Sequence, residues 1–553
     1  MKRKRTIIII TIALVIPLLL LTLIIVFAGA GRKIGEPISK GNIDIPFQRN
    51  IHFNTTSTLQ KDIIKTWSEG KVTDWVDGEK PDLKNPRTVL GCLLTGKRVE
   101  EINQYLMNQK ATGTAGSRWL LNPKGGYNFT TMAFTPLLFL FDDKPELLYP
   151  ETKKHLVENI LTIEGPGFTR YVPWLPIQDT ENHILMAESS RYLKNQWRRE
   201  HGNKSREFDN KNNGVEDGLK AYLNEIYTYG IYEFNSDPYL GYTYSSLLNL
   251  DAFATGEIKE LATKILDMIN WQYALNSYKF KHFPPYRRRF KDAFAKEIVS
   301  DYHSVMLMVW AGFYNDSLQF NISHGKHHAL WASMLPYRPS DKVIEWTLNK
   351  PNPFFVKMGH GYNSCPEIVS GDKSYLLSSG GANQGRRSLI MPKPTVLFLD
   401  DEAKNLDEIF YMYGPGEDFM EWNNTGIYED FACAKGKVHI PEGKQVVLTS
   451  GEWQIFSIFD SIFLAVFSEK ELGLMVVVRS NSAEDVANTI QQNNPDKKAY
   501  HTKFNHPNGN FITYDLDSPK DTWVIKSVNN KPVNRQFAKW PFFEGNIDGL
   551  TIE

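Results

Sequence analysis

Two different hydrophobic periods divide the chain. Between about residues 55 and 345, apolar residues recur every three or four positions, which is typical of amphipathic helices. The clearest stripes lie in EIKELATKILDMINW and in GVEDGLKAYLNEIYTYG, which ends on Gly230, a residue type that often caps helices. Gly, Pro and Asn separate the segments, so we expect successive helical hairpins. Further helices are predicted at 98–109, 152–163, 183–198, 242–254, 300–313 and 326–335.

Beyond about residue 350 the chain changes to short runs of β-branched and aromatic residues, broken by Gly, Asn, Asp and Pro. Strands at this spacing indicate an antiparallel β-sandwich. The segment NKPNPF, residues 349–354, marks the change. The predicted strands lie in TVLFLD, KQVVLTS, WQIFSIFDSIFLAVFS, GLMVVVRS, FITYDL and TWVIKSV.

The N-terminus carries a third pattern. MKRKR is followed by an uncharged apolar run from Thr6 to Phe27, close to the ~20 residues needed to span a bilayer. The basic residues before the run should stay in the cytoplasm. We therefore expect a transmembrane signal anchor on a cell-membrane protein with its bulk outside. A long cleaved signal that ends near FAGAG, and so a secreted protein, is the alternative.

Because 553 residues exceed what one core supports, we expect a multidomain α+β protein. The predicted divisions are 1–35 for the basic tip and anchor, 36–348 for a helical domain and 349–553 for the β-sandwich.

Composition narrows the function classes. Lys+Arg and Asp+Glu both number 63, so no net charge favours nucleic acid as a partner. Three distant cysteines, Cys92, Cys365 and Cys433, form no zinc or disulfide pattern. SHGKHHALW matches no zinc spacing and is better explained by surface histidines at a helix start. We expect neither a metal nor another cofactor.

Candidate chemistry first appears in WLPIQDTENHILMAESSRYL. Asp179 or Thr180 can cap a helix that has Asn182 and His183 in its first turn. The positive end of the helix dipole favours a neutral imidazole, which can accept a proton. The same dipole and the Asn182 amide can stabilise negative charge on a bound group. The alternative is that Asn182 caps the helix and His183 packs or faces solvent.

A second stretch, YEFNSDPYLGYTYSSLLNLDAFA, presents Tyr239 on a predicted loop and Tyr242 at the predicted start of the next helix. A tyrosine on such a loop can act as an acid or a base in a cleft. Simple packing of the rings between helices is the alternative.

TENHILM followed by EFNSDPYLGYTY resembles the (α/α)-toroid polysaccharide lyases, which include heparinase II/III-like, alginate and chondroitin/hyaluronan lyases. The resemblance implies a helical toroid followed by antiparallel β-sheet domains, and β-elimination of an acidic polysaccharide that contains uronic acid. It further implies that Asn182 neutralises the uronate carboxylate and that His183 and Tyr239 serve as base and acid. Tyr242 is an alternative to Tyr239, and His360 is a weak match to a further family histidine.

Other residues suit substrate binding. Tyr171, Trp174 and Gln178 lie just before Asn182, in RYVPWLP and the residues that follow it. The two aromatic rings can stack on sugars, or they can simply pack within the protein. HFPPYRRRFKD contains Arg287 and Arg288, which can grip carboxylates or sulfates or lie on a solvated loop.

Two other functions remain open. A glycoside hydrolase on the same toroid would need two carboxylates, and a non-catalytic cell-surface glycan-binding protein would need none. The candidate carboxylates are Asp179, Glu181, Glu188, Glu233 and Asp237.

Overall fold

The computed structural model describes most of the chain. The residues described are 14–21, 39–45, 53–72, 85–113, 125–163, 180–236, 239–287, 296–298, 302–320, 322, 326–361, 366–380, 390–391, 393–399, 402–412, 414 and 423–552.

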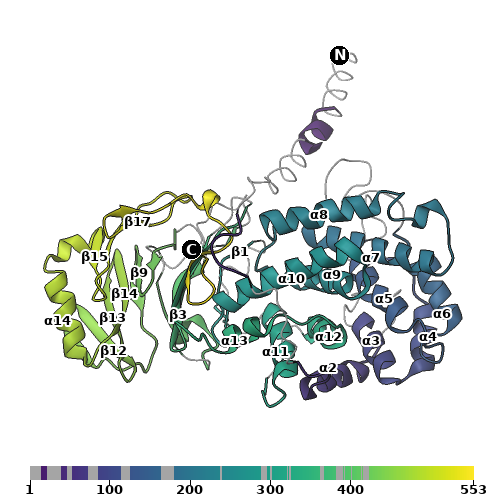
Figure 1. The fold of residues 1–553 in the computed structure, drawn as a ribbon, viewed down its shortest axis with the longest axis horizontal. Coiled ribbons are helices and arrows are strands. Elements are labelled where there is room, and N and C mark those ends of the chain that lie inside the picture. Colours follow the sequence, from purple (N-terminus) through teal and green to yellow (C-terminus); the bar gives the residue numbers. More distant parts are fainter. Residues whose placement is uncertain are drawn as a thin grey trace, which may run out of the picture.

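The protein is α+β, with a helical lobe and a β lobe side by side (Figure 1). Each predicted helical segment contains a helix. The helices are α2 (Thr58–Ser68), α3 (Asn85–Thr95), α4 (Val99–Met107), α5 (Asn128–Leu140), α6 (Pro150–His155), the π-helical η2 (Leu156–Ile160), α7 (Glu181–Glu200), α8 (Val215–Tyr229), α9 (Tyr239–Phe253), α10 (Gly256–Asn276), α11 (Tyr302–Tyr314), α12 (Lys326–Met334) and α13 (Asp341–Leu348).

The start of α9 corrects one prediction. Tyr239 is the first residue of the helix rather than part of a loop, and Tyr242 lies within its first turn. The Leu240 amide donates to the Ser236 carbonyl at 2.8 Å, which is a hydrogen bond of the helical i→i−4 type.

Helix packing follows from the apolar stripes. Residues predicted to share one face of α10, among them Ile258, Leu261 and Ile265, are buried in the core of the helical lobe together with Trp271 and Trp310. α7 packs against both α5 and α9, and α9 contacts α12. α2 packs against both α3 and α12, so early and late helices of the lobe are neighbours.

The β lobe consists of antiparallel sheets, and the predicted strand runs all contain strands. Its largest sheet has the order β10-β7-β6-β4-β3-β2-β19, and a second has the order β11-β12-β13-β14-β9-β8. A smaller sheet has the order β15-β16-β17-β18. The bounds are β2 (Phe354–Met358), β3 (Glu367–Asp372), β4 (Tyr375–Gly380), β6 (Lys393–Phe398), β7 (Phe410–Met412), β8 (Ile427–Tyr428), β9 (Phe431–Ala434), β10 (Val438–His439), β11 (Leu448–Ser450), β12 (Trp453–Phe459), β13 (Ile462–Glu469), β14 (Leu472–Arg479), β15 (Lys503–Asn505), β16 (Phe511–Tyr514), β17 (Ile525–Val528), β18 (Lys531–Pro532) and β19 (Glu544–Ile547).

The largest sheet is covered on both faces. Neighbouring strand residues point to opposite sides, and here they enter different cores. Val369 and Leu376 join the core of the helical lobe, whereas Ile368 and Leu377 join the core shared with the second sheet. All residues of β3 and β4 are consequently buried.

One helix of the β lobe was not predicted. α14 (Ala483–Asn493) begins after Ser482, whose hydroxyl accepts a hydrogen bond from the Asp485 amide at 3.1 Å. It packs against β12 and β13. A serine cap before SAEDVANTI was the available sequence signal.

The N-terminal part is described only in pieces. Residues 39–45 run beside the C-terminal end of the chain, where the Asn42 side chain exchanges hydrogen bonds of 3.0 and 2.9 Å with the Gly545 backbone. Residues 14–21 are helical and extend away from both lobes (Figure 1), with Leu14 67% exposed. No helix within the described residues is both long and apolar enough to span a bilayer. The rest of the predicted span from Thr6 to Phe27 lies outside them.

Candidate functional site

The first turns of α5, α7 and α9 meet inside the helical lobe. They bring the Asn-His pair close to Tyr242, because the Phe129 ring of α5 contacts both His183 and Tyr242. Tyr239 begins the helix that carries Tyr242. The ring-centroid distances are 5.1 Å to His183 and 4.6 Å to Tyr242. We call this cluster the helix-start site; its members are Asn128, Phe129, Asn182, His183, Tyr239 and Tyr242.

Asn182 occupies the second position of α7 and is completely buried. Its Oδ1 accepts a hydrogen bond of 2.8 Å from the Thr180 hydroxyl. Its Nδ2 has no hydrogen-bond partner among the described residues. A buried donor without an acceptor costs about 1–3 kcal/mol. A ligand atom that accepts a hydrogen bond from this amide would remove that cost.

His183 is half-buried and lies edge-on to Phe129. Its Nδ1 is 3.5 Å from the side-chain nitrogen of Asn128. A neutral imidazole carries its proton on one nitrogen only. The orientation of the Asn128 amide therefore sets which ring nitrogen of His183 is protonated, and with it which one can accept a proton.

The two candidate tyrosines differ in access. Tyr242 is 4% exposed and lies between the rings of Phe129 and His328. Burial raises the pKa of its phenol, against a smaller lowering by the charge of Arg87. Tyr239 is only partly buried. Tyr239 is therefore better placed to exchange a proton with a ligand, while Tyr242 forms part of the wall.

The loop that leads to Tyr239 is held from two sides. Glu181, the first residue of α7, accepts a hydrogen bond of 2.8 Å from the Tyr232 amide. Farther along the loop, Asn235 has a left-handed backbone with φ of 51° and donates to Glu367 of β3 at 2.8 Å. The start of α9 is thus tied to α7 and to the β lobe.

Glu367 is the centre of a buried polar cluster between the lobes. Its carboxylate is inaccessible to solvent, and His360 Nε2 lies 3.1 Å from Oε1. Gln272 donates to the same oxygen at 3.3 Å, and Asn276 donates to Oε2. We call this cluster the seam network; its members are Asn235, Gln272, Asn276, His360 and Glu367. His360 also stacks on Phe234 with a centroid distance of 4.3 Å.

The carboxylates considered for a hydrolase are mostly enclosed. Glu181, Glu188 and Glu233 are each at most 3% exposed. Glu181 binds backbone amides of the tyrosine loop, and Glu188 forms an ion pair of 2.5 Å with Arg191. Asp179 and Asp237 lie outside the described residues.

Most predicted substrate-binding residues, namely Tyr171, Trp174, Gln178 and Arg288, also lie outside the described residues. Arg287 is 4% exposed and belongs to the short strand β1 (Tyr286–Arg287), which pairs with β5 (Ile390–Met391). Its guanidinium lies over the Tyr232 ring, 4.2 Å from the centroid. The solvated-loop interpretation is therefore wrong for Arg287.

Sequence reasoning missed several neighbours of the site. Asn128 and Phe129 are the first two residues of α5, and Asn182 and His183 are the second and third residues of α7. A second Asn-aromatic pair near a helix start was therefore the available signal. His328 was predicted to be on the surface, yet it is fully buried and its Nδ1 lies 3.1 Å from the Ser245 hydroxyl. The apolar residues that follow it in HALW were the signal for burial, but the neighbouring histidines in the sequence favoured a surface position.

Within the described residues, no three His, Cys, Asp or Glu side chains gather closely enough to hold a metal ion. Cys92 and Cys433 are buried and unbonded to another cysteine, and Cys365 lies outside the described residues.

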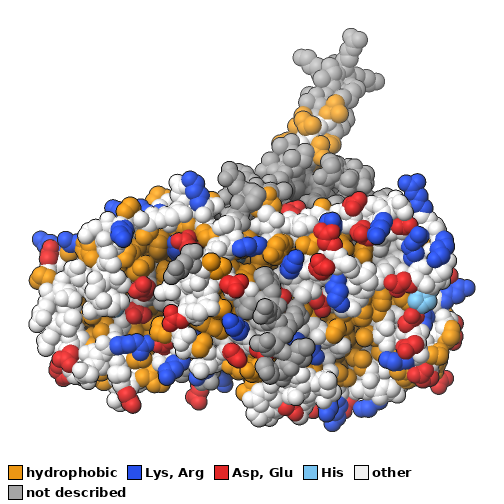
Figure 2. Space-filling view, in the orientation of Figure 1, with side chains coloured by type: hydrophobic (Ala, Val, Ile, Leu, Met, Phe, Trp, Pro, Cys, Tyr) orange, Lys and Arg blue, Asp and Glu red, His pale blue; other side chains and the backbone are white. Residues whose placement is uncertain are grey.

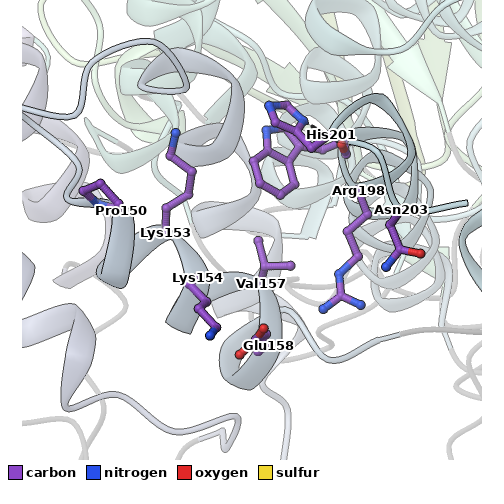
Figure 3. Close-up of a pocket in the computed structure, with 9 residues that line it drawn as sticks. Pro150, Lys153, Lys154, Val157, Glu158, Arg198, His201 and Asn203 are labelled. Carbon is purple, nitrogen blue, oxygen red and sulfur yellow. Dashed lines mark hydrogen bonds between the residues drawn. The ribbon is translucent and has the colours of Figure 1, made fainter.

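A separate concave feature lies at the other end of α7. We call it the α7-end pocket; its volume is about 450 Å³. In Figure 3, Lys153 and Pro150 lie on one side, Arg198, His201 and Asn203 on the other, and Val157 between them. Its lining consists of Pro150, Lys153, Lys154, Val157, Glu158, Trp197, Arg198, His201 and Asn203. It lies about 24 Å from Asn182 along the helix, at 1.5 Å per residue.

Neither a protein-family model nor any curated protein sequence matches this chain.

Proposed function

We propose that the protein is a polysaccharide lyase that cleaves a uronic-acid-containing polysaccharide by β-elimination at the helix-start site. The observation that carries this proposal is the buried Asn182 amide, whose Nδ2 lacks an acceptor among the described residues, next to His183. A hydrogen-bond donor that lacks an acceptor, at the positive end of a helix, can stabilise a carboxylate and the enolate that develops from it.

The proposed fold of the helical lobe is an (α/α) toroid. Supporting it, the packing order runs from α3 through α5, α7 and α9 to α12, and returns through α2 to α3. This packing order closes on itself, as it does in a ring of helices. Such a ring would place the starts of several helices around one opening.

In the proposed reaction, the C5 proton of the uronate is made more acidic when Asn182 neutralises the carboxylate. His183 or Tyr239 removes that proton, depending on the face that carries it. The electron pair forms the C4–C5 double bond, the C4–O bond breaks, and Tyr239 protonates the leaving oxygen. For His183 to act through Nε2, its Nδ1–H must donate to the oxygen of the Asn128 amide.

The proposed location is the outer face of the cell membrane, with the N-terminal segment as the anchor. The exposed apolar side chains of residues 14–21 support this, because an apolar helix that extends away from its protein requires a nonpolar surrounding. A secreted form is the alternative.

The test uses the purified full-length chain and a panel of uronic-acid polysaccharides, with ultraviolet absorbance of the unsaturated product as the readout. We expect Asn182→Ala to lower the turnover rate about 10²–10³-fold, as removal of one oxyanion donor does. His183→Ala and Tyr239→Phe should also abolish most activity. Tyr242→Phe is the matched control and should stay within about tenfold of the unaltered protein.

A flat absorbance trace with every polymer, from protein whose circular dichroism shows it to be folded, would reject elimination. Release of new reducing ends without absorbance would then indicate a hydrolase, and binding without any product would indicate a glycan-binding protein.

A further inference from the structure

Residues 39–45 are held against the rest of the protein mainly by their backbone, and we call them the clasp. Ile43 and Ile45 of the clasp are also buried in the core of the helical lobe. Because its hydrogen bonds are main-chain bonds to a distant part of the sequence, the clasp is docked much as a strand is in a sheet. These bonds run from the amides of Asn42 and Asp44 to the carbonyls of Phe543 and Leu550 (3.0 and 2.8 Å), and from the amides of Phe542, Phe543 and Ile552 to the carbonyls of Ser39, Lys40 and Asn42 (2.9, 3.1 and 2.7 Å).

Gly41 is the residue on which this docking depends. Its φ of 91° lies in the left-handed region, which side chains disfavour. A Cβ at this position would lie only 1.6 Å from the Phe543 carbonyl oxygen. Any side chain at position 41 must therefore push the clasp away from residue 543.

Lys40 ties the clasp to the end of α8. Its ammonium donates a hydrogen bond to the Tyr227 carbonyl, in the last turn of that helix. It also lies over the rings of Tyr227 and Phe542, at 3.8 and 4.2 Å from their centroids. Since the carbonyl end of a helix favours a cation, Lys40 holds the Phe542 ring close to the point where α8 ends.

Phe542 in turn packs where the loop before Tyr239 begins. A Cβ on Gly230, which ends α8, would lie 2.9 Å from the Phe542 ring and 3.9 Å from His360 Nδ1. His360 stacks on Phe234 of this loop and belongs to the seam network. Contacts are therefore continuous from the clasp, through Phe542 and the seam network, to the loop that positions the start of α9.

We propose that the clasp is a conformational control on the start of α9. While the clasp is docked, Phe542 and the seam network hold residues 231–236 in order, and displacement of the clasp releases this loop. The loop depends on such outside support because its Tyr232 amide is bound by Glu181 and its Asn235 side chain by Glu367. The inference does not depend on whether the helix-start site is catalytic.

The position of the clasp in the chain connects this control to the N-terminal segment. In Figure 2 the apolar side chains of residues 14–21 lie on the part that projects from the molecule, and the clasp follows them in sequence. A cut between Ile45 and Phe53 would separate the clasp from both lobes, whereas a cut before Ser39 would leave it joined to them. The place at which the chain is cut from its proposed anchor would thus decide whether the loop stays ordered.

The experiment is hydrogen exchange, followed by mass spectrometry, on the purified full-length chain and its Gly41→Ala variant. We expect the variant to exchange about tenfold faster or more in residues 39–45 and also in residues 231–236, because local opening sets these rates. Exchange in β13 and β14 should stay unchanged. The matched control is Gly202→Ala, since Gly202 has a similar φ of 90° but nothing within 4 Å of a Cβ; it should leave both segments unchanged.

Ile43→Ala provides the same comparison if Gly41→Ala does not fold, because it removes buried apolar atoms without a clash. We expect it to accelerate exchange in both segments by about threefold or more. Fast exchange in residues 39–45 with unchanged exchange in residues 231–236 would overturn the proposal. So would retained protection of residues 39–45 in Gly41→Ala, or equal acceleration in β13 and β14, which would mean that the clasp supports the whole fold.

Discussion

The helix-start site and the seam network are both buried polar clusters, but they differ in how completely their groups are paired. Both carboxylate oxygens of Glu367 accept hydrogen bonds from side chains of the helical lobe. Asn182, by contrast, keeps a buried amide nitrogen without an acceptor in the described residues. A paired cluster stabilises the fold, whereas a cluster with a donor left over is where a ligand gains most.

The largest effect on stability should come from the seam network. Glu367→Leu would leave the buried Asn276 amide without its acceptor and would remove one of the two acceptors of Asn235. We expect it to lower the free energy of unfolding by about 3–5 kcal/mol. Urea denaturation followed by circular dichroism measures this change. The control is Glu101→Gln, which breaks an exposed pair with Arg98 and should cost no more than about 1 kcal/mol. A loss below about 1 kcal/mol for Glu367→Leu would contradict the structural role of the seam.

A smaller, pH-dependent effect is expected at Lys350, also near the seam. Its ammonium donates to the Ala274, Ser277 and Trp346 carbonyls, and burial lowers its pKa to about 7 from 10.5. Between these values the unfolded chain binds more protons than the folded one, so this group makes stability rise with pH. Its contribution is present above the unfolded pKa and is lost as pH falls through about 7.

Relative to Lys350→Met, the unaltered protein should therefore gain on the order of 2 kcal/mol of stability between pH 7 and about pH 9. Urea midpoints of both proteins at the two pH values measure the difference. An identical pH dependence in the two proteins would show that the carbonyl acceptors hold Lys350 charged throughout.

The smallest effect on stability should come from the helix-start site. Asn182→Ala removes one accepted hydrogen bond from Thr180 and also removes a buried donor that lacks a partner. These contributions oppose each other, so the free energy of unfolding should change by less than about 1 kcal/mol. Differential scanning calorimetry can detect this. A loss above about 2 kcal/mol would mean that Asn182 supports the fold as Glu367 does.

Local pattern was sufficient for much of the secondary structure. The stripe on α10 and the strand runs from β12 to β14 follow directly from periods of 3.6 and 2. The start of α9 was misplaced by three residues because Asp-Pro suits both a turn and a first helical turn. α14 was missed because its serine cap lies inside a region dominated by strands.

The candidate site was only partly predictable. Asn182, His183 and Tyr239 stand out along the chain, and the structure places Asn182 and His183 together at the start of α7. Phe129 and His328, which contact Tyr242, come from helices far away in sequence. No local rule indicates that these rings would enclose one tyrosine and leave the other accessible.

The sequence by itself determined where many of the helices and strands lie and which short segments carry hydrogen-bonding groups at helix starts, because periodicity and capping act over a few residues. Only the tertiary structure decided which of those groups are already paired. Asn235 and Glu367 are 132 residues apart along the chain, yet they share a hydrogen bond of 2.8 Å. Burial and pairing depend on such distant partners, and they are what distinguish the seam network from the helix-start site.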